Sequence, residues 1–108
     1  MKWIPLTSEL QLEELRIRSN EVPQLIFKHS TRCSISSMVK NRLDKEPDTS
    51  EVECYYLDLL QYRSVSNAIA SIFEVEHQSP QVLLIKNGVC HYHESQHAIY
   101  FDDVLSNL

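Results

Sequence analysis

Glycine is almost absent from this sequence. Gly88 is the only glycine among 108 residues, whereas ordinary usage is about seven in every hundred. The Gly-x-Gly-x-x-Gly loop that binds dinucleotides and the Gly-x-x-x-x-Gly-Lys loop that binds phosphates both need several glycines, because their backbone must come close to the ligand. Nucleotide binding through either loop is therefore excluded.

No two of the three cysteines are close together in the sequence. Cys33, Cys54 and Cys90 are separated by 21 and 36 positions, so the chain has neither a Cys-x-x-Cys redox pair nor a zinc knuckle. An odd number of cysteines cannot form a closed set of disulfides, which favours a reducing compartment.

The longest purely apolar runs are four residues, so we expect no signal peptide, no membrane span and a cytoplasmic protein.

The rest of the composition fits one ordinary domain, residues 1–108, with a modest core. Residues 28–45 contain five bases and one acid, a local charge of +4, so the remainder of this −5 chain carries −9. Phosphate binding needs a broader basic face than one short segment, so we expect no nucleic acid as a partner. Without a membrane span, we expect no membrane partner either. A helix with a solvated basic side explains the segment unless it holds a ligand.

Apolar spacing and turn residues predict eight elements in the order α-β-α-β-α-β-β-α. Helices are expected near residues 9–18, 33–45, 64–73 and 101–108, and strands near residues 24–29, 52–59, 82–86 and 89–94. A right-handed crossover makes the first two strands parallel, and Asn87-Gly88 predicts a hairpin that makes the last two antiparallel. The result is an α/β, thioredoxin-like fold with a mixed four-stranded sheet flanked by helices. Another small α/β fold with the same order stays an alternative.

Cys33 is the strongest candidate for chemistry. It stands where the first predicted strand ends and the second helix begins, and the free N–H groups and dipole of a helix N-terminus favour an anion there. Arg32 is adjacent, and Lys28 and His29 lie just upstream, all of which favour the thiolate. Ser36, one helical turn later, is placed to donate a hydrogen bond to the sulfur. A free cysteine is most often a small buried residue, but the neighbours of Cys33 are polar: Ser30, Thr31, Arg32, Ser34 and Ser36.

No second cysteine accompanies Cys33. Position 36, where a dithiol oxidoreductase has its other cysteine, is serine. In the predicted fold Cys54 lies near the start of the neighbouring strand, roughly 15 Å away along strands that rise about 3.3 Å per residue. Cys90 lies at the same far edge, and both are expected to be core residues. Chemistry at Cys33 is therefore expected to be monothiol, with an external thiol resolving a mixed disulfide.

Pro80 precedes the third predicted strand, and by itself it is typical of a loop. In a thioredoxin-like fold this position holds a cis proline beside the active cysteine, although only about 5% of X-Pro bonds are cis. Ser79 would then offer free backbone groups to an extended substrate.

Three histidines, His91, His93 and His97, suggest a zinc site near the last strand. No carboxylate or cysteine completes the set, and histidines on an edge strand are commonly solvated. We therefore expect no metal site.

Three segments of the sequence carry a family resemblance. They are Trp3-Ile4-Pro5-Leu6-Thr7, then residues 27–37 with the sequence Phe-Lys-His-Ser-Thr-Arg-Cys-Ser-Ile-Ser-Ser, and Ser79-Pro80-Gln81 continuing to Asn87-Gly88. Together they resemble the monothiol bacilliredoxin family, which has a thioredoxin fold, and the resemblance covers essentially the whole chain. The cysteine segment is its most specific part.

This resemblance implies that Cys33 is a nucleophile that removes bacillithiol from mixed disulfides on client proteins. Bacillithiol is a low-molecular-weight thiol that some bacteria use in place of glutathione. By the same resemblance, Thr31, Arg32 and Ser36 form the immediate environment of the thiolate, and Pro80 is the cis proline. Many family members have proline directly after the cysteine, where this chain has Ser34.

The leading hypothesis is thus a bacterial, cytoplasmic thiol–disulfide exchange protein that binds no cofactor. Bacillithiol or a similar small thiol would be its co-substrate, and S-thiolated proteins would be its partners. Two alternatives stay open. One is a non-catalytic thioredoxin-fold adaptor that binds a partner through the surface around Cys33, and the other is a redox sensor in which Cys33 is only capped by small thiols.

Overall fold

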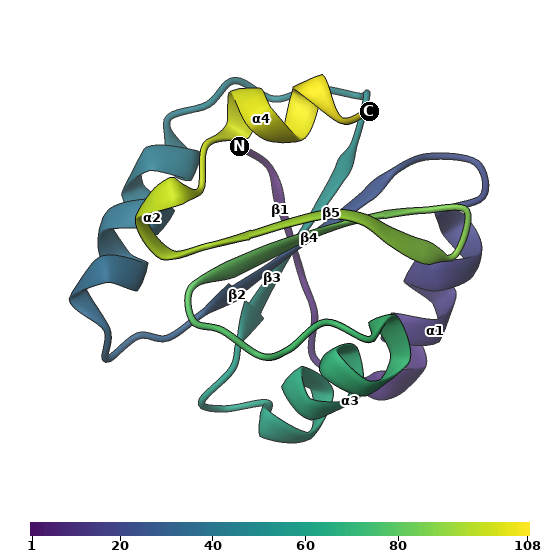
Figure 1. Ribbon diagram of the computed structural model, residues 1–108, viewed down its shortest axis with the longest axis horizontal. Helices are drawn as coiled ribbons and strands as arrows, with labels where there is room; N and C mark the ends of the chain where they lie inside the picture. Colours follow the sequence, from purple (N-terminus) through teal and green to yellow (C-terminus); the bar gives the residue numbers. More distant parts are fainter.

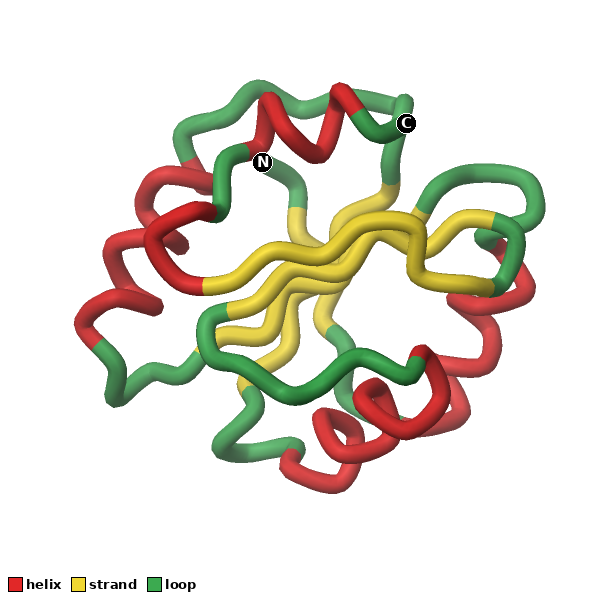
Figure 2. Tube along the Cα trace, viewed as in Figure 1, coloured by secondary structure: helices red, strands yellow, loops and turns green.

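Five strands form one mixed sheet in the order β1-β3-β2-β4-β5 (Figures 1 and 2). The computed structural model describes residues 1–108. Its elements are β1 (Trp3–Pro5), α1 (Glu9–Arg18), β2 (Gln24–His29), α2 (Ser34–Asp44), β3 (Glu53–Asp58), α3 (Arg63–Phe73), β4 (Gln81–Lys86), β5 (Val89–Ser95), the short 3-10 helix η1 (Gln96–Ala98) and α4 (Phe101–Ser106). The thioredoxin-like α/β class is confirmed.

The structure confirms the two strand directions that the sequence predicted, β2 parallel to β3 and β4 antiparallel to β5. Strands β2 and β3 are parallel, whereas β4 is antiparallel to both β2 and β5. Asn87 and Gly88 form the turn between β4 and β5, with φ angles of 52° and 79°. Two consecutive positive φ angles are what a two-residue hairpin requires, and asparagine and glycine tolerate them best.

The prediction of four strands was wrong, because β1 was missed. This strand is only three residues long, and it lies parallel to β3 with Trp3 beside Cys54. Contacts with distant residues hold it in place. The Trp3 ring stacks on Phe27 with centroids 5.5 Å apart, and its indole N–H donates to Asp44 at 2.6 Å. So short a strand has no alternation to read in the sequence.

The helices form two layers, one on each face of the sheet (Figure 1). Ile26 and Leu83 of the central strands pack with helices α1 and α3, and Leu25 and Phe27 pack with α2 and α4. All six residues of β2 are buried, as its apolar centre predicted. None of the helices has the length and apolar character that a membrane span requires.

The apolar faces of two helices are narrower than their sequence spacing suggested. In α1, Leu12 and Leu15 are buried, but Leu10 and Ile17 are 73% and 62% exposed. In α2, Ser36 is completely buried, whereas Met38 is 39% exposed. The buried position of Ser36 matters for the site.

Candidate functional site

The site forms at the edge of the sheet where β2 ends. Lys28 pairs with Leu57 of parallel β3 and with Gln81 of antiparallel β4. The chain therefore leaves β2 towards Cys33 at the same edge at which it enters β4 from Pro80. Two segments far apart in sequence thus meet at this edge, as the predicted fold required.

Cys33 is the N-cap residue of α2, with extended backbone angles of φ −107° and ψ 121°. Its N–H donates to the Ser30 carbonyl at 3.2 Å, and its carbonyl accepts from the Ser37 N–H at 3.0 Å. The side chain caps no backbone N–H, and the residue is partly exposed. Cys33 therefore lies at the N-terminal end of α2, where the free N–H groups of the first turn form the positive end of the helix dipole. This placement confirms the prediction.

Ser36 does not contact the sulfur, so the predicted hydrogen bond from Ser36 to Cys33 was wrong. The Ser36 hydroxyl accepts a hydrogen bond from the Ser30 N–H at 3.0 Å and lies 2.6 Å from His29 Nδ1. The hydroxyl is therefore engaged with Ser30 and His29, and it forms no hydrogen bond with the sulfur. The sequence showed that Ser36 comes one turn after Cys33, but not that its side chain points inward towards β2.

His29 is a neutral interior residue. It is 4% exposed, and the rings of Phe27 and Tyr56 lie 5.7 and 5.6 Å from it. Burial lowers the pKa of His29 below its ordinary value, and the charge of Lys40 lowers it further. A neutral ring supplies no positive charge to Cys33. The His29–Ser36 bond instead ties the end of β2 to the first turn of α2.

Three of the five bases between residues 28 and 45 are engaged elsewhere. Lys28 is completely buried, and Lys40 pairs with Asp44 at 2.7 Å. Arg42 donates to the Ile99 carbonyl at 2.6 Å, and its guanidinium lies over the Tyr100 ring, 4.1 Å from the ring centroid. A helix with a solvated basic side therefore does not account for these three residues.

Arg32 and Lys45 are the two bases of the segment that are exposed and form no ion pair. Thr31, beside Arg32, is also exposed. Arg32 and Thr31 directly precede the nucleophile, and Lys45 lies just beyond the far end of α2.

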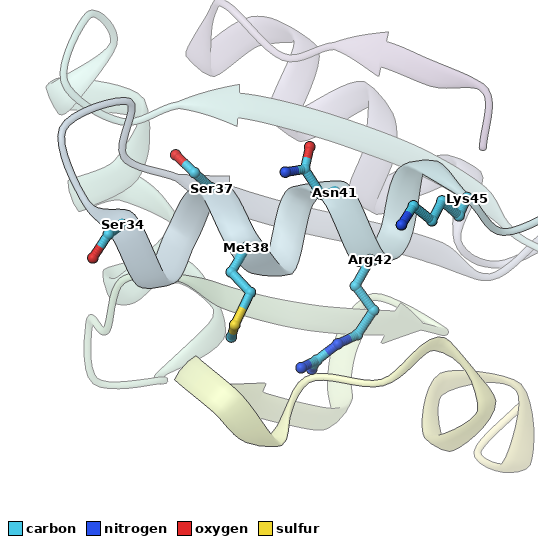
Figure 3. A pocket seen from close by; sticks show the side chains of 6 residues that line it. All are labelled: Ser34, Ser37, Met38, Asn41, Arg42 and Lys45. Carbon is cyan, nitrogen blue, oxygen red and sulfur yellow. The ribbon is translucent and has the colours of Figure 1, made fainter.

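A shallow groove of about 760 Å³ follows the outer face of α2 from beside Cys33 to Lys45 (Figure 3). Its lining is almost entirely polar: Ser34, Ser37, Met38, Asn41, Arg42 and Lys45. Met38 and Arg42 extend from the same side of the helix (Figure 3). The groove suits a small polar molecule better than an apolar one.

The peptide bond between Ser79 and Pro80 is cis, as the thioredoxin-like fold predicted. The Pro80 carbonyl accepts from the Gln96 N–H at 3.0 Å. In contrast, neither the N–H nor the carbonyl of Ser79 has a backbone partner, and its buried hydroxyl has none either. The backbone of Ser79 is therefore free to pair with an extended peptide.

The other two cysteines lie towards the opposite end of the sheet. Cys54 stands beside Leu25 near the start of β2, and burial raises the pKa of its thiol to about 12. Cys90 pairs with Ile85, is half-buried, and its pKa is also raised by burial. Both thiols stay protonated at neutral pH. Because Cys33 follows the other end of β2, the register of the strands places neither thiol beside it.

His91, His93 and His97 are exposed. No group of three or more histidine, cysteine, aspartate or glutamate side chains in the structure could hold a metal ion.

Sequence reasoning missed one pair of residues at the site. Lys28 Nζ lies 3.1 Å from His77 Nδ1, and His77 comes three residues before Pro80. Lys28 had been counted among the surface bases. The only available signal for His77 was its closeness in sequence to the proline.

Comparison with known proteins gives one family and one fold. The chain matches the family model described as monothiol bacilliredoxin BrxC over residues 4–104. A solved structure described as a candidate oxidoreductase with a thioredoxin fold is 27% identical, with a TM-score of 0.82 over 96% of this chain and 91% of that one. Thioredoxin from Malassezia sympodialis is 15% identical, with a TM-score of 0.76 over 97% of this chain and 86% of that one. Thioredoxin O2 from Arabidopsis thaliana, in its oxidised state, is 18% identical, with a TM-score of 0.67 over 96% and 89%. The two thioredoxins show the fold alone, whereas the family match together with the fold supports a thiol redox function.

Proposed function

This chain belongs to the monothiol bacilliredoxin family, and we propose that it removes bacillithiol or a similar small thiol from mixed disulfides on client proteins. The observation that carries the proposal is the position of Cys33. Its thiol is accessible, lies at the N-terminus of an 11-residue helix, and has no second cysteine within reach. Such a thiol can attack a disulfide but cannot close an intramolecular one.

The first step exchanges one disulfide for another. The Cys33 thiolate attacks the small-thiol sulfur of the mixed disulfide, whose S–S bond breaks while a new bond forms between Cys33 and the small thiol. The client sulfur leaves with the electron pair as a thiolate and takes a proton from water. The client cysteine is thereby reduced, and Cys33 is oxidised.

The second step needs a reductant from outside the chain, and a second molecule of the small thiol supplies it. Its thiolate attacks the small-thiol sulfur bonded to Cys33, which forms the symmetric small-molecule disulfide and releases the Cys33 thiolate. In both steps the positive end of the α2 dipole lies beside the sulfur of Cys33. No bound cofactor is needed.

The two surfaces beside Cys33 suit the two halves of the substrate. The free N–H and carbonyl of Ser79 support an extended client segment there. The polar groove along α2 supports the small thiol, and the unpaired charges of Arg32 and Lys45 favour one that carries carboxylates. A reducing compartment that holds such a thiol, the bacterial cytoplasm, is where this chemistry belongs.

The test is turnover of a client protein that carries one bacillithiol or glutathione mixed disulfide. With excess small thiol present, the wild-type chain and a Cys54→Ser/Cys90→Ser double variant should both release the client thiol, and Cys33→Ser should not. Full turnover by Cys33→Ser would overturn the proposal. The two alternatives give different results: an adaptor would leave the client untouched, and a sensor would accumulate capped Cys33 without repeated turnover.

A further inference from the structure

Lys28 is a cation in the interior of the protein. Its exposed fraction is 0%, and it lies in β2, five residues before Cys33. An ammonium group has three N–H donors, but its one hydrogen-bond partner in the chain is His77 Nδ1, at 3.1 Å. Burying a charge is costly unless a partner compensates for the lost water. Because burying this charge for one hydrogen bond is costly, we infer that the Lys28–His77 bond has a role in the fold or at the site.

His77 belongs to the segment that carries the cis proline. Residues 74–79 connect α3 to Pro80 and are mostly exposed. Within this segment, the Glu76 carbonyl accepts from the Gln81 side chain at 3.0 Å, and the Gln78 N–H donates to the same side chain at 3.4 Å. Both contacts come from β4, the strand that this segment enters. The Lys28–His77 bond is the one that reaches it from β2, the strand that leads to Cys33.

We propose that the Lys28–His77 pair positions the Ser79–Pro80 segment beside Cys33, and that protonation of His77 releases it. This inference rests on the proposed function, because the segment matters only if it holds a client. Both residues are positioning residues: they touch each other and hold two segments together, and neither contacts the reacting sulfur atoms.

The charges around the pair set its response to pH. Nδ1 can accept from the ammonium only while His77 is neutral, with its proton on Nε2. Burial, together with the charges of Lys28 on β2 and Arg63 at the start of α3, lowers the pKa of His77 below its ordinary value of 6.5.

Few other charges face the pair. The sheet neighbours of Lys28, Leu57 on β3 and Gln81 on β4, are uncharged, and the carboxylates nearest to His77 in sequence are Glu74 and Glu76 of its own segment. Once the pH falls far enough below 6.5 to protonate His77, a second cation would face Lys28 and the hydrogen bond would be lost.

Four variants separate positioning from other roles. Lys28→Met and His77→Leu remove the bond, whereas His77→Asn keeps an acceptor oxygen near the position of Nδ1 but does not titrate. His91→Asn is the matched control, because His91 is exposed on edge strand β5. Each variant is assayed for kcat and KM on an S-thiolated client between pH 5.5 and 7.5, and for thermal stability.

We expect Lys28→Met and His77→Leu each to raise the client KM at pH 7.5, by about three- to tenfold, with a smaller effect on kcat. Lys28→Met should also be at least as stable as wild type, a combination that a merely structural lysine would not give. The wild type and His91→Asn should show a rising KM from pH 6.5 to 5.5, and His77→Asn should not. If only Lys28→Met raises KM, Lys28 acts through its charge and the proposal is overturned. A wild-type pH profile in His77→Asn would overturn it as well.

A second measurement does not depend on turnover. Nuclear magnetic resonance can follow the backbone amides of Gln78, Ser79 and Gln81 while the His77 ring is titrated. The proposal predicts that these amide shifts follow the titration in the wild type and not in His77→Asn. If the amide shifts stay unchanged while His77 titrates, the positioning role of the Lys28–His77 pair is refuted, even in an active protein. If the amide shifts follow the titration in a protein without turnover, the positioning role is supported and the proposed function is refuted.

Discussion

The hydroxyl of Ser36 lies 2.6 Å from Nδ1 of His29 and joins the first turn of α2 to the end of β2. Ser36 stands three residues after Cys33, where a dithiol oxidoreductase has its second cysteine. In this chain the position serves the architecture of the site: the hydroxyl fixes the loop that holds the nucleophile, and the sulfur is left without an intramolecular partner.

Ser36→Ala should therefore lower stability more than it alters Cys33. The substitution leaves the buried Ser30 N–H and the His29 ring without a partner, which costs about 1–3 kcal/mol. Urea unfolding measures this loss. The alkylation rate of Cys33 in the folded variant should stay within about threefold of wild type, because the hydroxyl does not bond to the sulfur. A loss of more than tenfold in that rate, with the fold intact, would show that Ser36 does serve the sulfur.

Lys28→Met should stabilise the protein at neutral pH. Burial lowers the pKa of Lys28 from 10.5 to about 8, so the folded state binds a proton less tightly than the unfolded state. The charged lysine therefore lowers the free energy of unfolding at every pH below about 8, and this penalty disappears as the pH rises from 8 to 10.5. The difference in pKa corresponds to about 3 kcal/mol, of which the lost bond to His77 offsets a part.

The measurement is urea unfolding of both proteins, under reducing conditions, between pH 7 and 10. The advantage of Lys28→Met should be largest at pH 7 and shrink towards pH 10. Lys45→Met removes an exposed charge of the same kind and should show no such trend. A destabilised Lys28→Met at pH 7 would contradict the account of a costly buried cation.

The three thiols should react with iodoacetamide at very different rates in the folded protein. Cys33 is accessible and should react first. Cys90 is half-buried and Cys54 is buried, and burial raises the pKa of both thiols. Cys90 should therefore react more slowly than Cys33, and Cys54 should react only when the protein unfolds. Peptide mass spectrometry gives the three rates. Equal labelling of Cys54 and Cys33 under native conditions would be incompatible with this structure.

Arg42 and Lys45 line the same groove but should play different parts. Arg42 donates to the carbonyls of His97 and Ile99 at 3.0 and 2.6 Å, so Arg42→Ala should destabilise the protein by about 1–3 kcal/mol. Lys45→Gln should leave stability unchanged and slow the resolving step with an anionic small thiol by about two- to fivefold at low salt. Urea unfolding curves measure the stability of both variants, and the salt dependence of the resolving rate measures the effect of the Lys45 charge. A rate that falls equally with a neutral thiol would remove Lys45 from small-thiol binding.

The place of Cys33 could be predicted because it depends on local signals. The apolar centre of β2 ends at Phe27, a helical pattern begins after Cys33, and Pro80 precedes an apolar strand. The thioredoxin-like order of elements then brings the proline to the cysteine, and the structure confirms both the helix N-terminus and the cis bond.

What the sequence could not show depends on side-chain direction and on contacts between distant segments. Ser36 has the spacing of a residue that faces the sulfur, yet it points to His29. Lys28 has the charge of a surface residue, yet it is buried against His77, 49 positions away. Strand β1 exists because Trp3 packs on Phe27 and not because of any pattern in its three residues.

The central claim, that Cys33 accepts the small thiol from the client, is tested most directly by a single-turnover experiment. One equivalent of S-thiolated client is mixed with the Cys54→Ser/Cys90→Ser variant in the absence of free small thiol, and intact masses are recorded over time. The account predicts that the mass of the small thiol less two hydrogens leaves the client and appears on the variant at the same rate. A client that keeps its adduct, or that becomes covalently joined to Cys33 with loss of the small thiol, would contradict it.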